Sequence, residues 1–136
     1  MILNGVKEFD IPKILDERGN LSFIEKGVDL TFDIKRVYWI YDVPGGEIRG
    51  GHAFKTQKEV IVALSGSFDV VLHDGNKSVC YSLNRSYKGL YVPEIYWREM
   101  ENFSTNAVCL VLASTFYSEG DYILDFETFI KLIQDK

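Results

Sequence analysis

The sequence is poor in the residues that disulfides, redox pairs and metal sites require. Among its 136 residues are only two histidines and two cysteines. Cys80 and Cys109 lie in alternating or apolar segments and lack the C-x-x-C spacing of metal or redox pairs. We therefore expect two reduced, buried thiols and no cysteine chemistry.

The chain also lacks an excess of basic charge and long hydrophobic runs. A net charge of −5 and a pI near 5.0 argue against nucleic acid as the main partner, although a local basic pocket could still bind a phosphorylated ligand. The N-terminus has no basic stretch followed by an apolar run, and no segment approaches the ~18 apolar residues of a membrane span. We therefore expect a cytoplasmic protein with no membrane partner.

Much of the chain alternates apolar and polar residues with a period of two, which is typical of β-strands. Short runs of β-branched and aromatic residues alternate with Gly, Asp or Asn, which predicts strands at 21–26, 35–43, 59–66, 67–75, 79–84, 89–94, 97–102 and 107–115. Residues 124–136 instead place apolar side chains at helical spacing, with Asp125 as the N-cap. Since no repeat or linker interrupts the pattern, it predicts one all-β domain, residues 1–136, with one C-terminal helix.

One stretch resembles the first motif of cupin barrels, G-x5-H-x-H-x4-E-x6-G. Four of its five positions match, at Gly46, His52, Glu59 and Gly66. Phe54 replaces the second histidine, and the second cupin motif, laid over residues 93–102, puts Arg98 at the remaining metal histidine. Neither side chain has a lone pair to donate, so we expect no bound metal. The resemblance implies a cupin double-stranded β-helix, a jelly-roll barrel.

A histidine without a metal can act as an acid or base, because it exchanges protons near neutral pH. Arg18, Arg36 and Arg49 could bind an anion or stabilise an oxyanion. Together with His52 they suit enolisation next to a carbonyl, in which a base removes an α proton and a fixed positive charge stabilises the enediolate. The residues alone also allow a structural histidine and arginines in surface ion pairs.

Six segments read together resemble the nucleotide-sugar 3,4-ketoisomerases of the WxcM-like cupins. They are DERGNLSFIEK, FDIKRVYWIYDVP, RGGHAFK, IVALSGSFDVVLHDG, LYVPEIYW and LASTFYSEGDYILDFETF. The resemblance implies a homodimeric RmlC-like enzyme without metal or cofactor, which converts dTDP-4-keto-6-deoxyglucose to its 3-keto isomer. A transaminase would then form a 3-amino sugar for surface glycans such as lipopolysaccharide.

The same resemblance implies the site residues. The first histidine of the family motif RG-x-HAHK, which moves the proton between C3 and C4, is His52, with Arg18 and Tyr38 as further catalytic residues. Phe54 stands at the second histidine, so either one histidine suffices, or Tyr38 or Tyr96 protonates the sugar oxygen, or catalysis has been lost. Substrate contacts are expected from Asp16, Arg36, Arg49, Lys55, Tyr96, Trp97 and Arg98.

Several other functions remain open at this point. A related epimerase or dehydratase acting on a similar nucleotide sugar would share the enolisation step. A non-catalytic sugar-binding cupin is suggested by Phe54, and a metal-dependent dioxygenase is a more distant alternative. For an isomerase, the gluco and galacto products both remain open, because a few side chains around the sugar decide from which face the proton returns to C4.

Overall fold

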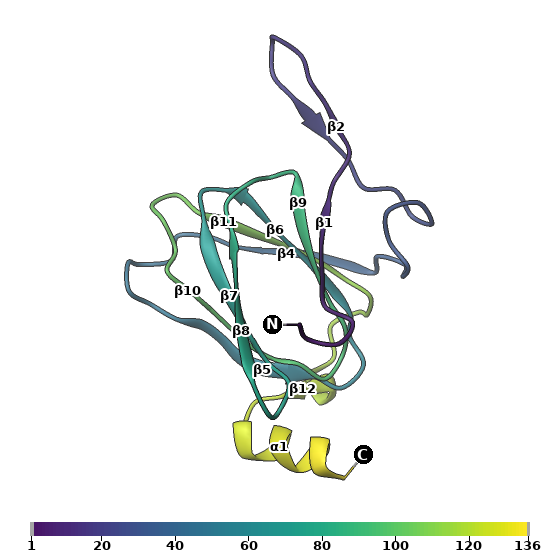
Figure 1. Ribbon diagram of the computed structural model, residues 1–136, viewed down its shortest axis with the longest axis vertical. Helices are drawn as coiled ribbons and strands as arrows, with labels where there is room; N and C mark the ends of the chain where they lie inside the picture. Colours follow the sequence, from purple (N-terminus) through teal and green to yellow (C-terminus); the bar gives the residue numbers. More distant parts are fainter. Residues whose placement is uncertain (1, 136) are drawn as a thin grey trace.

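Two five-stranded antiparallel sheets pack into a barrel in the computed structural model, which describes residues 2–135 (Figure 1). The first sheet contains, in order, β1 (Lys7–Asp10), β9 (Lys88–Val92), β6 (Glu59–Ser65), β11 (Val108–Ala113) and β4 (Arg36–Ile40). The second contains β12 (Tyr122–Ile123), β5 (Arg49–Phe54), β10 (Trp97–Glu101), β7 (Phe68–His73) and β8 (Ser78–Leu83). The prediction of an all-β barrel is confirmed.

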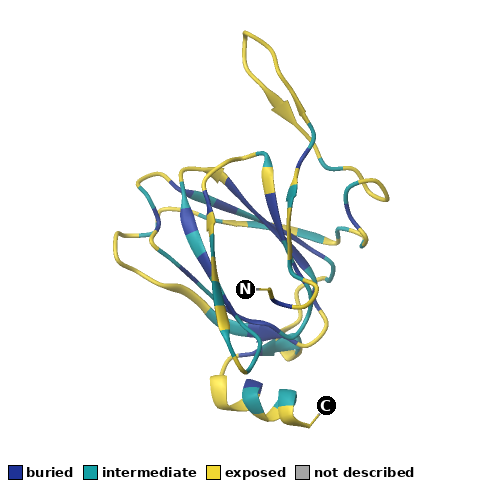
Figure 2. Cartoon of the chain, in the orientation of Figure 1, coloured by how far each residue is buried: buried dark blue, intermediate teal, exposed yellow. Residues whose placement is uncertain are grey.

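The core lies between the two sheets, as the buried strand interiors in Figure 2 show. Along β7, Phe68, Val70 and Leu72 are buried and alternate with partly exposed residues, because successive side chains of a strand point to opposite faces. Strand β6 is buried on both faces. A second apolar cluster covers its outer side and includes Ile11 and Leu30 from the segments before β4.

Helix α1 (Phe126–Gln134) packs on the outer side of the second sheet, after the short 3-10 turn η1 (Glu119–Asp121). The side chain of Asp125 accepts a hydrogen bond from the backbone N–H of Thr128 at 3.0 Å, so the predicted N-cap is confirmed. Phe129 is fully buried against the sheet. No helix within residues 2–135 is long and apolar enough to cross a membrane.

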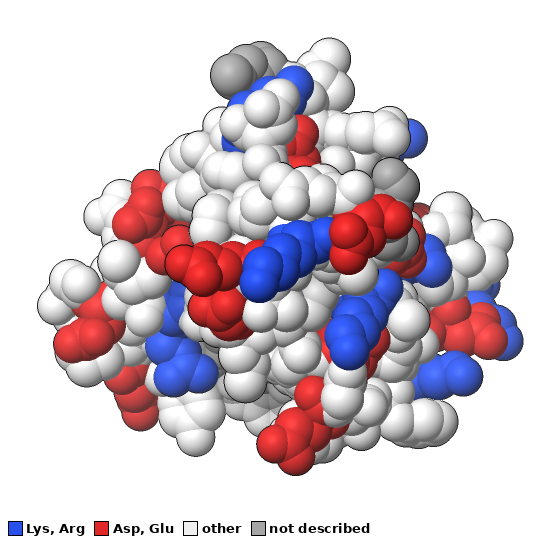
Figure 3. Space-filling model, turned by 90° about the horizontal axis from the view of Figure 1, so that it is seen from below, with Lys and Arg blue, Asp and Glu red and all other residues white. Residues whose placement is uncertain are grey.

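A hairpin of β2 (Lys13–Ile14) and β3 (Leu21–Ser22) extends away from the barrel (Figure 1). The predicted strand over 21–26 is therefore much shorter than expected. Its residues are largely exposed, as the yellow colour of the hairpin in Figure 2 indicates. Seen from below the barrel, acidic and basic side chains are intermixed over the face that Figure 3 shows.

The prediction of two buried thiols is half wrong. Cys109 on the central strand β11 is fully buried, but Cys80 is exposed. Cys80 lies on β8, the edge strand of its sheet, at a position whose side chain points away from the core.

Candidate active site

A cleft of about 500 Å³ opens between the edges of the two sheets. Its walls come from β4 at the end of the first sheet and from β5 and β12 at the end of the second. The lining residues are Tyr38, Ile40, Ile48, Arg49, Gly50, His52, Met100 and Tyr122. Clefts of this size accommodate small ligands, since ligand pockets measure roughly 300–1,000 Å³.

Strand β5 presents His52 to this cleft. His52 and Phe54 are two residues apart and share the face toward the barrel interior, whereas Ala53 between them packs against the side of α1. Gly50 makes the close approach to β10 possible. Its φ is +97°, and a Cβ there would lie 3.0 Å from the carbonyl oxygen of Arg98, where the register between the strands shifts.

The surroundings of His52 keep its imidazole neutral. Burial lowers its pKa to about 4, and the positive charges of Arg98 and Arg49 act in the same direction, whereas a backbone hydrogen bond with Gly50 opposes them. The Nε2 atom is buried and has no hydrogen-bond partner within the described residues. At neutral pH, His52 is therefore a neutral base on the cleft wall, with one ring nitrogen unsatisfied by the protein.

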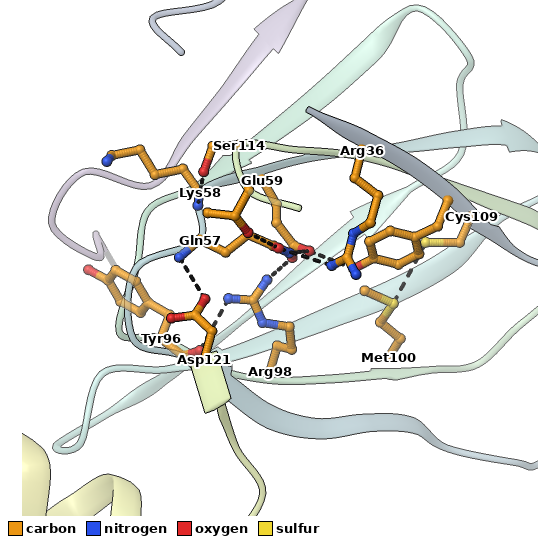
Figure 4. A network of polar contacts seen from close by, with 12 residues as sticks. Arg36, Gln57, Lys58, Glu59, Tyr96, Arg98, Met100, Cys109, Ser114 and Asp121 are labelled. Carbon is orange, nitrogen blue, oxygen red and sulfur yellow. Dashed lines mark hydrogen bonds and ion pairs between the residues drawn. The ribbon is translucent and has the colours of Figure 1, made fainter. Parts of the chain in front are cut away.

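A buried ion pair lies beside the cleft, and Figure 4 shows the hydrogen bonds around it. Glu59 and Arg98 are almost fully buried, and the Arg98 guanidinium donates to Oε1 of Glu59. Oε2 accepts from the Tyr38 hydroxyl at 2.5 Å and from Nε2 of Gln57 at 2.7 Å. Both carboxylate oxygens are satisfied, which a buried charge requires.

The donor set does not fit a divalent metal. Both oxygens of Glu59 already accept hydrogen bonds. The Arg98 guanidinium lies 4.9 Å from the ring centre of Phe54, so the two residues at the other ligand positions contact each other. Within residues 2–135, no group of three His, Cys, Asp or Glu side chains could hold an ion. Among the motif's ligand positions in the described residues, only His52 has a ring nitrogen, Nε2, that no other side chain contacts through a hydrogen bond and that could still coordinate a metal.

The structure brings several of the predicted site residues together. Tyr38, Arg49 and His52 all line the cleft. Arg36 lies on the same face of β4 as Tyr38, with its guanidinium 5.0 Å from the Tyr38 ring, and donates to Oε1 of Gln57 at 3.0 Å. Arg36 is thus linked to Tyr38 through Gln57 and Glu59, but it is not among the residues that line the cleft. Arg98 is enclosed by its bond to Glu59 and lies behind the cleft wall.

The polar residues of the hairpin and the loop after β5 lie elsewhere. Asp16 and Arg18 pair with each other at 2.8 Å in the turn of the hairpin, where the Arg18 side chain is 90% exposed. The chain does not bring them to its own cleft. Lys55 is exposed in the bend that follows β5, and it is not among the residues that line the cleft.

Two aromatic residues expected to touch substrate belong to the packing instead. The Trp97 ring contacts Phe126 and Phe129 of α1, at ring-centre distances of 5.3 and 6.0 Å, on the outer face of the sheet. The Tyr96 ring lies in the main core, and its hydroxyl donates to the backbone carbonyl of Asn4. Neither side chain is among those that line the cleft, and the ligand contact expected of each stays a prediction.

Tyr122 lines the cleft, although the sequence predicted only a structural role for the Asp121–Tyr122 pair, which fits the family pattern. It faces Phe54 across the β5–β12 pair, and its ring lies 4.6 Å from the Phe54 ring and 5.3 Å from that of His52. The preceding Asp121 is structural, because its carboxylate accepts from the backbone N–H and the hydroxyl of Thr56. Strand β12 has only two residues, so no alternation could reveal it.

Fold and site together define a cupin barrel with a neutral histidine on the wall of its cleft. The sequence matches the family described as WxcM-like, C-terminal (FdtA), over residues 4–134. It is 45% identical over 127 residues to a TDP-4-oxo-6-deoxy-alpha-D-glucose-3,4-oxoisomerase of Aneurinibacillus thermoaerophilus, covering 93% of this chain and 91% of the relative. The chain therefore belongs to the WxcM-like, C-terminal (FdtA) family.

Solved structures of ketoisomerases have the same fold. A 3,4-ketoisomerase from Helicobacter canadensis is 40% identical with a TM-score of 0.94, and the match covers 96% of this chain and 98% of that one. A mutant 3,4-ketoisomerase from Thermoanaerobacterium thermosaccharolyticum, in complex with TDP-4-keto-6-deoxyglucose, is 36% identical with a TM-score of 0.96, covering 99% and 98%. These matches confirm the predicted RmlC-like cupin fold and the predicted family.

Proposed function

We propose that the protein is a nucleotide-sugar 3,4-ketoisomerase that converts dTDP-4-keto-6-deoxyglucose to the 3-keto isomer. The observation that carries the proposal is His52, a neutral base with an unpaired Nε2 on the wall of the cleft. Relatives that share fold and sequence over nearly the whole chain act on or bind this TDP-sugar. The reaction takes place in the cytoplasm, and a transaminase then uses the product to make a 3-amino sugar for surface glycans.

The chemistry needs one base that reaches two neighbouring carbons. His52 removes the proton from C3, next to the C4 carbonyl, and returns it to C4 after the enediol has formed. A low pKa suits this role, because the imidazole must be unprotonated when substrate binds. Arg49 supplies positive charge at the cleft, where it can bind the diphosphate or stabilise the enediolate.

Deuterium oxide provides the test. Purified protein incubated with dTDP-4-keto-6-deoxyglucose in deuterium oxide should incorporate deuterium at the exchanging sugar carbons, and His52→Asn should abolish it. Product analysis separates this reaction from epimerisation, because an epimerase inverts a centre without moving the keto group. Absence of exchange and turnover in the wild-type protein, with binding retained, would favour a non-catalytic sugar-binding cupin.

We also propose that the working enzyme is a homodimer. Asp16 and Arg18, expected near the sugar, lie in a hairpin that extends from the barrel of their own chain (Figure 1). A second copy whose hairpin reaches this cleft would supply them. Large apolar side chains exposed on the hairpin and on the first sheet are suited to such an interface: Ile14, Leu15, Leu21, Trp39, Tyr41 and Leu64. Light scattering should give twice the chain mass of 15.6 kDa.

A further inference from the structure

Ketoisomerisation needs a second proton-transfer group, because the sugar oxygens change their protonation as well as the carbons. Phe54 occupies the position of the family's second histidine and cannot transfer a proton. The hydroxyls of Tyr38, Tyr96 and Tyr122 are the candidate neutral donors, and two of them are already engaged. Tyr96 donates to the backbone in the core, and Tyr38 donates to Glu59 at 2.5 Å.

Tyr38 is poorly suited to release its proton to substrate. Burial raises the pKa of its phenol far above the ordinary value, and the negative charge of Glu59 raises it further. Its hydroxyl also holds the Glu59 carboxylate, together with Arg98 and Gln57. A Tyr38 phenolate beside Glu59 would put two negative charges next to each other.

The hydroxyl of Tyr122, in contrast, is available to a ligand. This hydroxyl makes no hydrogen bond to another residue in the part of the chain that the structure describes, and the side chain lines the same cleft as His52. Pairing of β12 with β5 places it directly opposite Phe54, with the two rings 4.6 Å apart. The phenol therefore lies beside the position of the family's second histidine. Its proximity also adds to the raised pKa of Tyr38.

We propose that Tyr122 is the catalytic residue that transfers protons to and from the sugar oxygens, in place of the second histidine. The inference rests on the proposed ketoisomerase function. His52 handles the protons on carbon, and Tyr122 handles those on oxygen.

The two residues together balance the reaction. As His52 takes the C3 proton, the C3–H electrons form the C3–C4 double bond, and the C4 carbonyl oxygen takes the proton of the Tyr122 phenol. The phenolate then takes the proton of the C3 hydroxyl as the C3 carbonyl forms, and the imidazolium returns its proton to C4. C3 is oxidised by two electrons and C4 is reduced by two, so no external oxidant or reductant is needed.

Steady-state kinetics of Tyr122→Phe test the inference, with Tyr117→Phe as the matched control. Tyr117 is an exposed tyrosine whose ring lies 5.8 Å from that of Tyr122, and it lies outside the cleft lining. Loss of an acid–base group should lower kcat of Tyr122→Phe about 10²- to 10⁴-fold, with KM changed less than about threefold. Tyr117→Phe should keep the wild-type kcat.

The outcomes separate the two proposals. If the wild-type protein has no ketoisomerase turnover, the proposed function fails. If wild-type and Tyr117→Phe turn over and Tyr122→Phe keeps kcat within about threefold, the role of Tyr122 is overturned and the function stands.

A second experiment asks whether the two groups do the same work. Introducing Phe54→His into Tyr122→Phe should raise kcat at least about tenfold above that of Tyr122→Phe, because the new imidazole can then exchange protons with the sugar oxygens. Near-UV circular dichroism establishes that the double variant is folded. A folded double variant no more active than Tyr122→Phe would show that Tyr122 does not perform the task of the second histidine.

Discussion

At the scale of single residues, burial and two positive charges lower the pKa of His52, and burial has the larger effect. The imidazole is partly buried, and two arginines lie close enough to disfavour its protonated form. Of these, Arg98 is neutralised by Glu59, whereas Arg49 is exposed at the cleft and carries its charge unpaired within the described residues. Arg49, three residues before His52 on the same strand, therefore adds a smaller effect to that of burial.

Replacing Arg49 should move the pH dependence of the reaction. Arg49→Gln removes a charge that lowers the His52 pKa, so the acidic limb of kcat/KM should shift from near pH 4 to higher pH. Because Arg49 is exposed, added salt should produce a smaller shift in the same direction in the wild-type protein. An unchanged acidic limb in Arg49→Gln would contradict this account of the charge.

The depressed pKa of His52 also predicts how folding stability depends on pH. The unfolded chain binds a proton on His52 below about pH 6.5, but the folded chain does so only near pH 4. The contribution of His52 is therefore fully present above pH 6.5 and is lost as the pH falls toward 4. In urea titrations, wild-type protein should lose more stability over this range than His52→Asn, and parallel losses would contradict the prediction.

Glu59 gives a third prediction at this scale. Glu59→Ala leaves the Arg98 charge buried without a partner, so the free energy of unfolding should fall by about 3–5 kcal/mol. The control is Glu94→Ala, which breaks the half-exposed pair of Glu94 with Lys58 and should cost no more than about 1 kcal/mol. Urea denaturation measures both, and equal losses would mean that burial of the Arg98 pair has little energetic effect.

At the scale of elements, the strands rich in β-branched residues were predictable, whereas β5 and β12, which carry His52 and Tyr122, were not. Alternation located β4 and β6 to β11 apart from small differences at their ends, and capping located α1. Strand β5 contains two adjacent glycines, which have low strand propensity, and β12 is too short to show a period. His52 was found through a motif, whereas the place of Tyr122 in the cleft follows only from the pairing of β12 with β5.

Local sequence spacing also did not predict where the side chains of Tyr96 and Trp97 pack. Tyr96 and Trp97 are adjacent, so they point to opposite faces of the sheet, but the sequence does not say what covers each face. Tyr96 packs in the main core, and Trp97 packs against α1. Packing against a helix distant in sequence is a tertiary contact, which the local spacing of residues does not predict.

The approach of β5 to β10 can be tested at Gly50. Gly50→Ala places a Cβ 3.0 Å from the Arg98 carbonyl oxygen and forces an L residue to a φ of +97°. We expect a loss of stability of about 1–3 kcal/mol and a decrease in kcat, because β5 must shift and take His52 with it. Gly45→Ala is the control, because its Cβ would meet nothing within 4 Å. Equal stability and activity of the two variants would show that the bulge does not position the histidine.

At the scale of the whole molecule, the barrel and the hairpin are separate parts. The barrel carries His52, and the hairpin carries Arg18 on an extension that leaves the barrel (Figure 1). If the proposed dimer exchanges hairpins between clefts, each active site is assembled from two chains.

Mixing variants tests this arrangement. His52→Asn and Arg18→Ala should each have little activity, but a refolded equimolar mixture should regain up to about a quarter of wild-type activity, because half of its dimers contain one intact site. Each variant refolded alone is the control. If the mixture is no more active than the average of its components, Arg18 does not act in the cleft of a partner chain.

The contact between Phe54 and Arg98 couples the effects of substitutions at these two positions. Each residue stands at a position where a metal-binding cupin has a histidine, and the two side chains pack against each other at 4.9 Å. Changing Arg98 alone leaves the buried Glu59 carboxylate without its positively charged partner, and Phe54→His alone replaces the phenyl ring beside the guanidinium with an imidazole. The effect of a substitution at either position therefore depends on the residue at the other, so the two positions are epistatic.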